Sequence, residues 1–248
     1  MYTFVFRICV ACTLLAVAFA EIPSYIKICH RKDPNINNCV LNSIEQLRSK
    51  LKAGIPELEV PAIEPLTLKH IRLLRGPQAA RLDVNLTNLQ VFGPSTFKIR
   101  DLKIDPENVF ITFKVGFQKL DFRGKYKINA QILLLNLVGD GNLTGTFFGY
   151  DSECLMKSKK IIKNNSTYVN FEKMKIKIKI NKAALNFDNL FGGDPVLGSA
   201  SNEILNSNSE FLIDEIRPVL EDSLSDLFTS IANKITLKFT YDDLFPNN

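Results

Sequence analysis

Residues 197–236 read LGSASNEILNSNSEFLIDEIRPVLEDSLSDLFTSIANKIT, and the expected architecture follows from this segment. Apolar side chains recur in it at every third or fourth position, which is the spacing of one helix face. The stripe consists of Leu212, Ile216, Leu220, Leu224, Leu227, Ile231 and Ile235, and it is widened by Ile204, Phe211, Val219 and Phe228. An uninterrupted helix here would be roughly 57 Å long. Pro218 is expected to bend this helix or divide it into two.

A stripe this wide on so long a helix needs a concave partner. The same segment carries seven acidic residues against two basic ones, a charge that excludes a membrane span. The partner must therefore come from the rest of the 248-residue chain. Its composition, 46% hydrophobic and 23% charged, is that of a globular protein and excludes a disordered or fibrous one.

From about Pro65 to Leu190 the apolar period changes to two residues, which is typical of half-buried strands. The apolar sets are Val109, Ile111, Phe113, Val115 and Phe117, then Tyr126, Ile128, Ala130, Ile132 and Leu134, and finally Met174, Ile176, Ile178 and Ile180. The last set alternates with Lys173, Lys175, Lys177 and Lys179, named here the lysine comb. No helix-length pattern interrupts the strands, so parallel crossovers are not expected.

Two of the strand patterns change phase midway. The apolar positions move from odd to even after Phe97 and Ile99, and from even to odd after Val84 and Leu86. A change of phase within a strand requires a bulge, and bulges bend sheets. The sequence therefore predicts an α+β fold in which a highly curved antiparallel sheet wraps the long C-terminal helix, within one domain over residues 21–248.

A short N-terminal helix is expected after the turn at Asp33-Pro34-Asn35. Asn37 or Asn38 would cap its start, and Gly54 with Pro56 would end it. Its apolar face consists of Val40, Leu41, Ile44, Leu47 and Leu51. Cys29 and Cys39 are close enough in sequence for a local disulfide, the default pairing in an oxidising compartment. Cys154 is then left over and is expected to be a buried small side chain, with an intermolecular or unusual pairing as the alternative.

Residues 1–20 have the pattern of a secretory signal peptide. An apolar run from Ile8 to Phe19 is followed by Ala18-Phe19-Ala20, which has small residues where a signal peptidase needs them. No later apolar stretch is long enough to span a bilayer, so the protein is expected to be secreted and extracellular, without stable membrane insertion. Four N-glycosylation sequons agree with export. They begin at Asn85, Asn142, Asn164 and Asn165.

The sequence contains none of the common catalytic motifs, so we do not expect the protein to be an enzyme. The chain lacks the nucleophile-elbow, zincin, EF-hand and phosphate-loop motifs, and its two histidines, His30 and His70, have no matching ligand cluster. Gly139–Gly145, GDGNLTG, nearly matches a dinucleotide-binding motif, but it lies between strand patterns and is better explained as a hairpin turn. We therefore expect no catalytic residue, no metal and no cofactor.

The lysine comb is one candidate binding surface. No aromatic residues interleave with the lysine comb to stack bases, so nucleic acid is not expected as a partner. Contact of the comb with a membrane surface or a receptor stays open as an alternative function, with a core that lacks a ligand cavity.

The interior offers the other binding site. A helix inside a curved sheet packs well along its middle, whereas the tapered ends are hard to fill. An incompletely filled end would be an apolar pocket that binds lipid-like molecules. The chain is also rich in phenylalanine, with 18 Phe and no Trp, and these rings would otherwise fill the interior. Periodicity alone leaves both outcomes open.

Three stretches resemble the insect takeout / juvenile hormone-binding protein family. The N-terminal one is Cys29 to Cys39 around Asp33-Pro34-Asn35, followed by Gly54–Leu58 and Glu64–Leu66. A middle one is Phe92-Gly93 with Phe97, and the C-terminal one is Ile231–Lys234 followed by Tyr241–Pro246. The hormone carriers of the family typically have a second disulfide, for which Cys154 has no partner here, so the chain is more similar to the takeout-like branch.

This resemblance implies an internal hydrophobic tunnel and carriage of a small lipophilic ligand in haemolymph or sensory lymph. The ligand would be a terpenoid such as juvenile hormone, or a fatty acid-like molecule, carried by a monomer. The family is linked to circadian and feeding physiology. The inner strand phases and the helix stripe then give the expected lining: Val40, Ile44, Leu47, Ile111, Phe113, Phe117, Ile128, Leu134, Phe147, Leu185, Phe187, Phe211, Ile216, Leu220 and Phe228.

Overall fold

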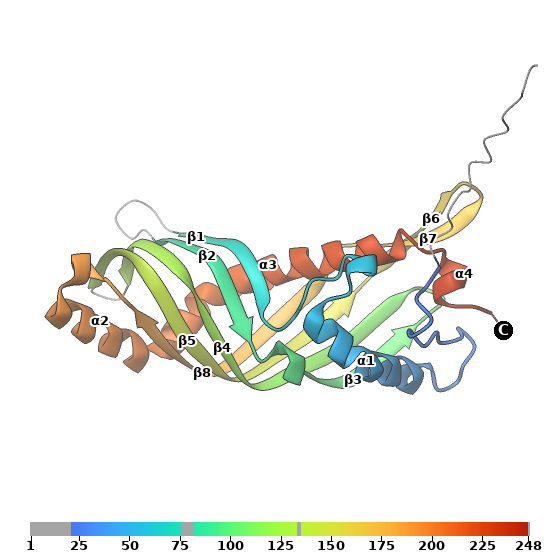
Figure 1. The fold of residues 1–248 in the computed structure, drawn as a ribbon, viewed down its shortest axis with the longest axis horizontal. Helices are drawn as coiled ribbons and strands as arrows, with labels where there is room; N and C mark the ends of the chain where they lie inside the picture. Colours follow the sequence, from blue (N-terminus) through green and yellow to red (C-terminus); the bar gives the residue numbers. More distant parts are fainter. Residues whose placement is uncertain (1–20, 76–81, 133–134, 248) are drawn as a thin grey trace, which may run out of the picture.

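The structure is a computed structural model that describes residues 21–75, 82–132 and 135–247. The predicted leader, residues 1–20, and Leu134 lie outside this range. The α+β class is confirmed (Figure 1). In chain order the elements are α1 (Ile36–Ala53), η1 (Pro56–Leu58), β1 (Leu66–Arg75), β2 (Leu82–Phe92), η3 (Pro94–Thr96), β3 (Lys98–Asp105), β4 (Phe110–Ile132), β5 (Leu135–Met156), β6 (Ser158–Lys163), β7 (Ser166–Phe171), β8 (Lys175–Phe187), η4 (Phe191–Gly193), α2 (Pro195–Ser207), α3 (Ser209–Thr236) and α4 (Tyr241–Leu244).

The main sheet has the order β1-β2-β4-β5-β8, and β3 also pairs with β4. All pairings among the described strands are antiparallel, as the lack of helical connections predicts. Strands β4 and β5 contain 23 and 22 residues and pair from Ile111↔Met156 to Ile132↔Leu135. At about 3.3 Å per residue each is roughly 70 Å long, which sets the elongated shape of the molecule.

Both predicted phase changes coincide with irregularities in strand pairing. In β2 the register against β4 shifts between Thr87 and Gln90, where Asn88 has φ 52°. In β3 the register shifts between Arg100 and Lys103, where Asp101 has φ 53°. The extra residue at each shift lets the strand bend. The sheet consequently curves around one side of α3 (Figure 1).

The long C-terminal helix is confirmed, but its break lies elsewhere than expected. Asn208, with φ −114° and ψ 32°, separates α2 from α3, whereas Pro218 lies inside the continuous 28-residue helix α3. A proline removes one hydrogen bond of a helix. The many apolar contacts of α3 with the sheet offset that loss, so the helix continues through Pro218.

Helix α2 is fastened to the edge strand β8 by asparagine side chains. The Asn206 Oδ1 atom accepts a hydrogen bond from the Leu185 amide at 2.7 Å, and its Nδ2 group donates to the Leu185 carbonyl at 2.7 Å. Asn202 makes the same pair of bonds with Phe187, both at 2.9 Å. The side-chain amides therefore replace a neighbouring strand at an edge that would otherwise be unpaired.

The prediction of a hairpin turn at Gly139–Gly145 is wrong, because these residues lie within β5. Their glycines instead make room for neighbouring groups. A Cβ atom on Gly145 would lie 2.4 Å from the Phe122 ring, and one on Gly141 would lie 2.8 Å from the Asp188 carbonyl oxygen. The glycines thus permit close approach of side chains and backbone to a long strand, which is another common use of glycine in sheets.

Helix α1 starts earlier than its asparagines predict. The N-cap residue is Asn35, whereas the Asn37 side chain accepts a hydrogen bond from the Ile104 amide of β3 at 2.9 Å. The helix ends at Gly54, with φ 89°, as expected. Asn37 therefore ties α1 to the sheet and does not cap it.

The disulfide between Cys29 and Cys39 is present, and Cys154 is a buried free thiol.

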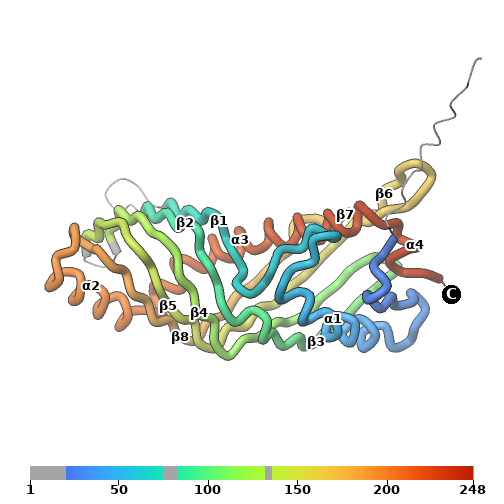
Figure 2. The backbone as a smooth tube through the Cα atoms, in the orientation of Figure 1, coloured from blue at the N-terminus to red at the C-terminus, as the bar shows by residue number. Residues whose placement is uncertain are grey.

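The two ends of the described chain meet beside α1 and α4 (Figure 2). The Arg31 guanidinium pairs with the Asp242 carboxylate and lies 4.3 Å above the centre of the Tyr241 ring. The Arg31 amide also donates to the Pro246 carbonyl at 3.0 Å. The segment before α1 is thereby held to the C-terminal segment.

The lysine comb lies on the outer face of β8, as its alternation predicts. Lys175, Lys177 and Lys179 are exposed, and the isoleucines between them are buried. Two members of the comb are ion-paired with α3. Lys173 contacts Asp222 and Asp226 at 2.6 and 2.7 Å, and Lys177 contacts Glu221 at 3.2 Å.

Candidate functional site

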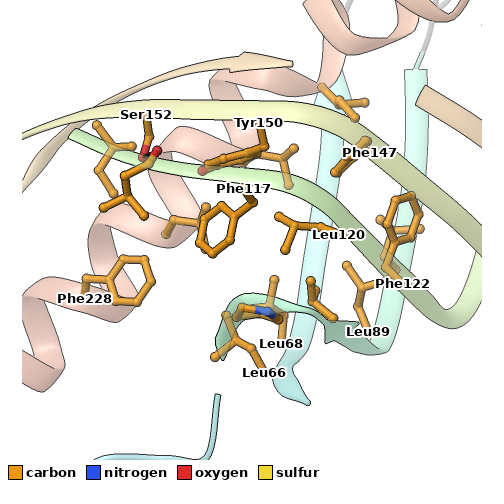
Figure 3. Close-up of a pocket in the computed structure, with 18 of the residues that line it drawn as sticks. Leu66, Leu68, Leu89, Phe117, Leu120, Phe122, Phe147, Tyr150, Ser152 and Phe228 are labelled. Carbon is orange, nitrogen blue, oxygen red and sulfur yellow. Dashed lines mark hydrogen bonds between the residues drawn. The ribbon is translucent and has the colours of Figure 1, made fainter. Parts of the chain in front are cut away.

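A large apolar cavity lies between α3 and the concave face of the sheet, with a volume of about 870 Å³. Its wall contains residues of β1, β2, β4, β5 and β8 on one side and of α3 on the other. Figure 3 shows Leu66, Leu89, Phe117 and Phe147 from four different strands pointing toward one space that Phe228 of α3 also faces. The volume is in the upper part of the range for small-molecule sites.

The structure brings most of the predicted lining residues to this cavity. Those in its wall are Ile44, Phe113, Phe117, Ile128, Phe147, Leu185, Phe187, Phe211, Ile216, Leu220 and Phe228. These positions come from three strands and two helices, so their convergence depends on the curvature of the sheet. The ligand-binding role of each stays a prediction.

Three predicted residues do not reach the wall. Helix α1 contributes Ile44 and Leu51 to the wall, whereas Val40 and Leu47 of the same apolar stripe are not part of it. Ile111 packs against the buried cluster around Val109 and Met156. The prediction of these three residues rests on the apolar period alone, which does not specify what each inward side chain packs against.

The prediction also missed lining residues, and the reason is another change of phase. Within β4 the inward positions move from Phe117 to Leu120 and Phe122. The letters Phe117-Gln-Lys-Leu120-Asp-Phe122 contain this change, so periodicity would have found them. Further wall residues from β1, β2 and β3 are Leu66, Leu68, Leu73, Val84, Leu86, Leu89, Val91 and Ile99.

A short polar row interrupts the apolar wall. Tyr150, Ser152 and Cys154 alternate along β5 and all three line the cavity. The Ser152 hydroxyl lies 3.4 Å from the Val115 carbonyl and 3.8 Å from the Cys154 sulfur. Burial raises the pKa of Tyr150, although its proximity to Ser152 acts in the opposite direction. The phenol is therefore neutral and can donate a hydrogen bond to a ligand.

The wall next to α1 is held by an arginine clamp. The Arg48 guanidinium donates to the carbonyls of Ser95 and Phe97 at 2.6 and 3.0 Å and lies 3.7 Å above the centre of the Phe97 ring. Glu45 accepts two further hydrogen bonds from it at 2.7 Å. Because Phe97 is in the cavity wall, this clamp fixes the end of the cavity that α1 covers.

The described residues around the cavity contain no metal-ligand cluster and no activated thiol. Among the described residues, no three metal-binding side chains come together, and burial raises the pKa of the Cys154 thiol, which makes it a poor nucleophile. In the same part of the chain, no helix is long and apolar enough to cross a bilayer. A concave, mostly apolar cavity of this volume is typical of binding sites for small hydrophobic molecules.

Comparison with known proteins specifies the family. Residues 7–246 match the model for haemolymph juvenile hormone binding protein, and the chain belongs to this takeout / juvenile hormone-binding protein family of hydrophobic-ligand carriers. Circadian clock-controlled protein daywake of Drosophila melanogaster is 22% identical over 231 residues, covering 90% of this chain and 88% of that protein. Its counterpart in Drosophila yakuba is 23% identical over 235 residues, with the same coverage.

The fold also matches a solved structure. The crystal structure of Epiphyas postvittana Takeout 1 superposes with a TM-score of 0.74 and 20% sequence identity. The match covers 89% of this chain and 100% of that one. It confirms the predicted long helix with its antiparallel sheet. The relation to takeout-like proteins expected from the sequence is confirmed as well.

Proposed function

We propose that the protein is a secreted, non-enzymatic carrier that holds a small hydrophobic ligand in the cavity between α3 and the sheet. The observation that supports this proposal most directly is the cavity of about 870 Å³, whose wall is almost wholly aliphatic and aromatic. Transfer of a lipid chain from water into such a space is favourable by about 25 cal/mol per Å² of buried apolar surface. Membership of a carrier family agrees with this use of the cavity.

The ligand class follows from the shape and polarity of the wall. Lining residues of α3 extend from Phe211 to Ile235, a distance of roughly 36 Å along the helix. An elongated molecule such as a terpenoid, for example juvenile hormone, or a fatty acid-like chain fits this space. One polar group of such a ligand would be placed near Tyr150 and Ser152.

The remaining expectations belong to the same proposal. A secreted carrier would act as an extracellular monomer after loss of residues 1–20. Glycans on any of the four sequons would face water from the outer surface. The Asn164 and Asn165 side chains are exposed at the turn between β6 and β7, whereas the Asn142 Nδ2 group donates to the Asp188 carboxylate at 2.8 Å.

The alternative function, membrane or receptor contact through the lysine comb without a ligand cavity, has weaker support. Acidic residues of α3 pair with Lys173 and Lys177, which lowers the positive charge that the comb presents. An unfilled interior of this size is also unexpected for a protein that acts only through its surface.

A matched pair of aspartate variants tests carriage. Phe113 is in the cavity wall, whereas Phe148 of β5 is 39% exposed on the outer face. Phe113→Asp is expected to abolish uptake of a fluorescent fatty acid or terpenoid, because a buried carboxylate opposes an apolar ligand, and Phe148→Asp is expected to retain it. Circular dichroism checks that both variants fold, and Phe228→Asp replaces Phe113→Asp if the latter does not.

Unchanged uptake by folded Phe113→Asp and Phe228→Asp would contradict the proposed binding site. Native mass spectrometry of protein secreted from insect cells supplies an independent measurement. A co-purifying lipid-sized mass that a folded Phe113→Asp variant lacks is the expected result. A bare protein mass that also fails to take up any of the fluorescent probes would overturn the carrier function.

A further inference from the structure

The hairpin of β6 and β7 stands apart from the main sheet. These two strands pair only with each other among the described strands, and Figure 1 shows them projecting beyond the body near α4. Residues 159–165, at the outer part of the hairpin, are all exposed. This segment is therefore available for contact with another surface.

The outer part of the hairpin carries apolar side chains on both faces. Ile162 is 82% exposed, more than any other large hydrophobic side chain in the described residues, and Ile161 is 38% exposed. Ile161 pairs with Tyr168 across the hairpin and Ile162 pairs with Thr167, so the two isoleucines point to opposite faces. Exposed apolar groups gathered at a projecting tip mark a contact site better than single ones scattered over a surface.

Lysines surround these isoleucines. Lys159, Lys160 and Lys163 lie in β6 itself, and Lys157 comes just before it. In the described chain, Lys159 is ion-paired with Glu172 at 2.9 Å, and the Lys160 ammonium lies 4.1 Å from the centre of the Tyr241 ring. In the lysine comb, by contrast, three carboxylates of α3 pair with two lysines. The hairpin therefore presents the less neutralised positive charge.

The base of the hairpin borders the cavity. Met156, the last residue of β5, and Met174, directly before β8, both line the cavity wall. The chain between these two methionines contains the whole hairpin. A surface that contacts the tip would consequently lie close to this end of the cavity.

We propose that the tip of the β6–β7 hairpin docks the protein on anionic lipid bilayers. Ile161 and Ile162 enter the headgroup region, and the lysines of β6 lie against anionic headgroups. Apolar residues beside basic ones provide the two attractions that hold proteins at such an interface. This contact goes beyond carriage and needs no ligand in the cavity.

The sequons at Asn164 and Asn165 lie in the turn of the same hairpin. A glycan on either residue would place a bulky hydrophilic group where the isoleucines must meet lipid. Docking is therefore a property of the chain without a glycan at this turn. Enzymatic removal of N-linked glycans should increase binding of any preparation that carries one there.

Sedimentation with vesicles tests the docking proposal. Full-length protein from insect cells, after removal of N-glycans, is mixed with vesicles of phosphatidylcholine alone or with added phosphatidylserine. Binding to the mixed vesicles is expected, with binding to phosphatidylcholine at least about tenfold weaker. The double variant I161T/I162T, which keeps β-branched residues in the strand, should bind the mixed vesicles at least about tenfold less.

Charge variants complete the test. K159Q/K160Q/K163Q should lower binding at least about tenfold, whereas the comb variant K175Q/K179Q should leave it unchanged. The proposal is overturned if the deglycosylated protein does not sediment with the mixed vesicles. It is also overturned if I161T/I162T binds like the parent, or if only the comb variant loses binding. Uptake of the fluorescent lipid in solution should be the same in all these variants, which separates a failure of docking from a failure of carriage.

Discussion

Tyr150 places a hydrogen-bond donor in a wall that is mostly apolar. Its side chain is 8% exposed, and that of the neighbouring Ser152 is 6% exposed. A ligand with an acceptor group would receive a hydrogen bond from the phenol in apolar surroundings, where such a bond is electrostatically stronger than in water. The polar row on β5 therefore favours ligands that carry an oxygen over plain hydrocarbons of the same length.

The first prediction concerns this selectivity. Tyr150→Phe should weaken binding of an oxygen-bearing terpenoid or fatty acid by about 0.5–1.5 kcal/mol, because one hydrogen bond is lost. Binding of a hydrocarbon of matched length should not change, since the ring remains. Displacement of a fluorescent probe by each compound measures both affinities. Equal losses for the two compounds would show that the phenol contributes packing and no hydrogen bond.

The Glu64 carboxylate holds a loop of the cavity wall in place through hydrogen bonds. Its carboxylate accepts hydrogen bonds from the amides of Gly93 at 2.8 Å and Ser95 at 3.2 Å, next to the wall residue Pro94. Burial acts to raise the pKa of Glu64, but these hydrogen bonds outweigh it and the pKa is lowered. A carboxyl group with a lowered pKa in the folded state stabilises that state when it is ionised.

The second prediction follows from the sign of this shift. The stabilisation should be complete above the ordinary glutamate pKa of about 4.3 and should be lost as the pH falls through the lower folded-state value. Glu64→Gln should reduce the free energy of unfolding by about 1 kcal/mol at neutral pH, a figure reduced for solvent screening. The difference from the parent protein should shrink toward zero at acidic pH. Urea denaturation at several pH values measures it, and a difference independent of pH would contradict the assignment.

At the scale of elements, polar side chains of the helices form hydrogen bonds with backbone groups at the edges of strands. In addition to the α2 contacts with β8, the Asn233 amide group of α3 forms hydrogen bonds with the Phe171 amide and carbonyl at 2.7 and 2.9 Å. Glu221 accepts a hydrogen bond from the Ile178 amide at 2.9 Å. These contacts fix the position of the helices along the sheet, and with it the width of the cavity.

The third prediction tests one of these contacts. Asn206→Leu should lower the free energy of unfolding by about 1–3 kcal/mol, because the amide and carbonyl of Leu185 lose their partners in a part-buried site. Glu203→Gln, at an exposed position of the same helix, serves as the control and should have little effect. Chemical denaturation measures both variants. A loss no larger than that of Glu203→Gln would show that water replaces the asparagine.

The elements differ in how far the sequence predicts them. The bulges near Asn88 and Asp101 follow from changes of apolar phase, because only an extra residue can keep both halves of a strand facing the core. The break at Asn208 does not follow, since Pro218 is the stronger local signal and packing overrides it. The glycines of β5 likewise resemble a turn in isolation. Their use becomes visible only when Phe122 and Asp188 are placed against them.

The cavity depends on the whole molecule, which limits how far sequence can predict it. Alternation identifies inward side chains such as Phe117 and Phe147, because strand geometry fixes their direction. Whether these side chains touch one another or leave a space depends on the curvature of the sheet and its distance from α3. The sequence analysis missed the polar row at Tyr150, Ser152 and Cys154 for a related reason. Polar residues in a strand are usually interpreted as facing solvent.

The length of the cavity gives the last prediction, which belongs to the molecule as a whole. Leu220 lies near the middle of the lining positions of α3. Leu220→Trp should fill the cavity there and divide it, so that a long-chain fatty acid loses at least about tenfold in affinity through reduced apolar burial. A medium-chain acid should still bind, because one half of the space is enough for it. Val196→Trp, at a 75% exposed position of α2, provides the control of equal size. Probe displacement across chain lengths measures the preference, and equal losses for both acids in a folded Leu220→Trp protein would show that the ligand does not extend along α3.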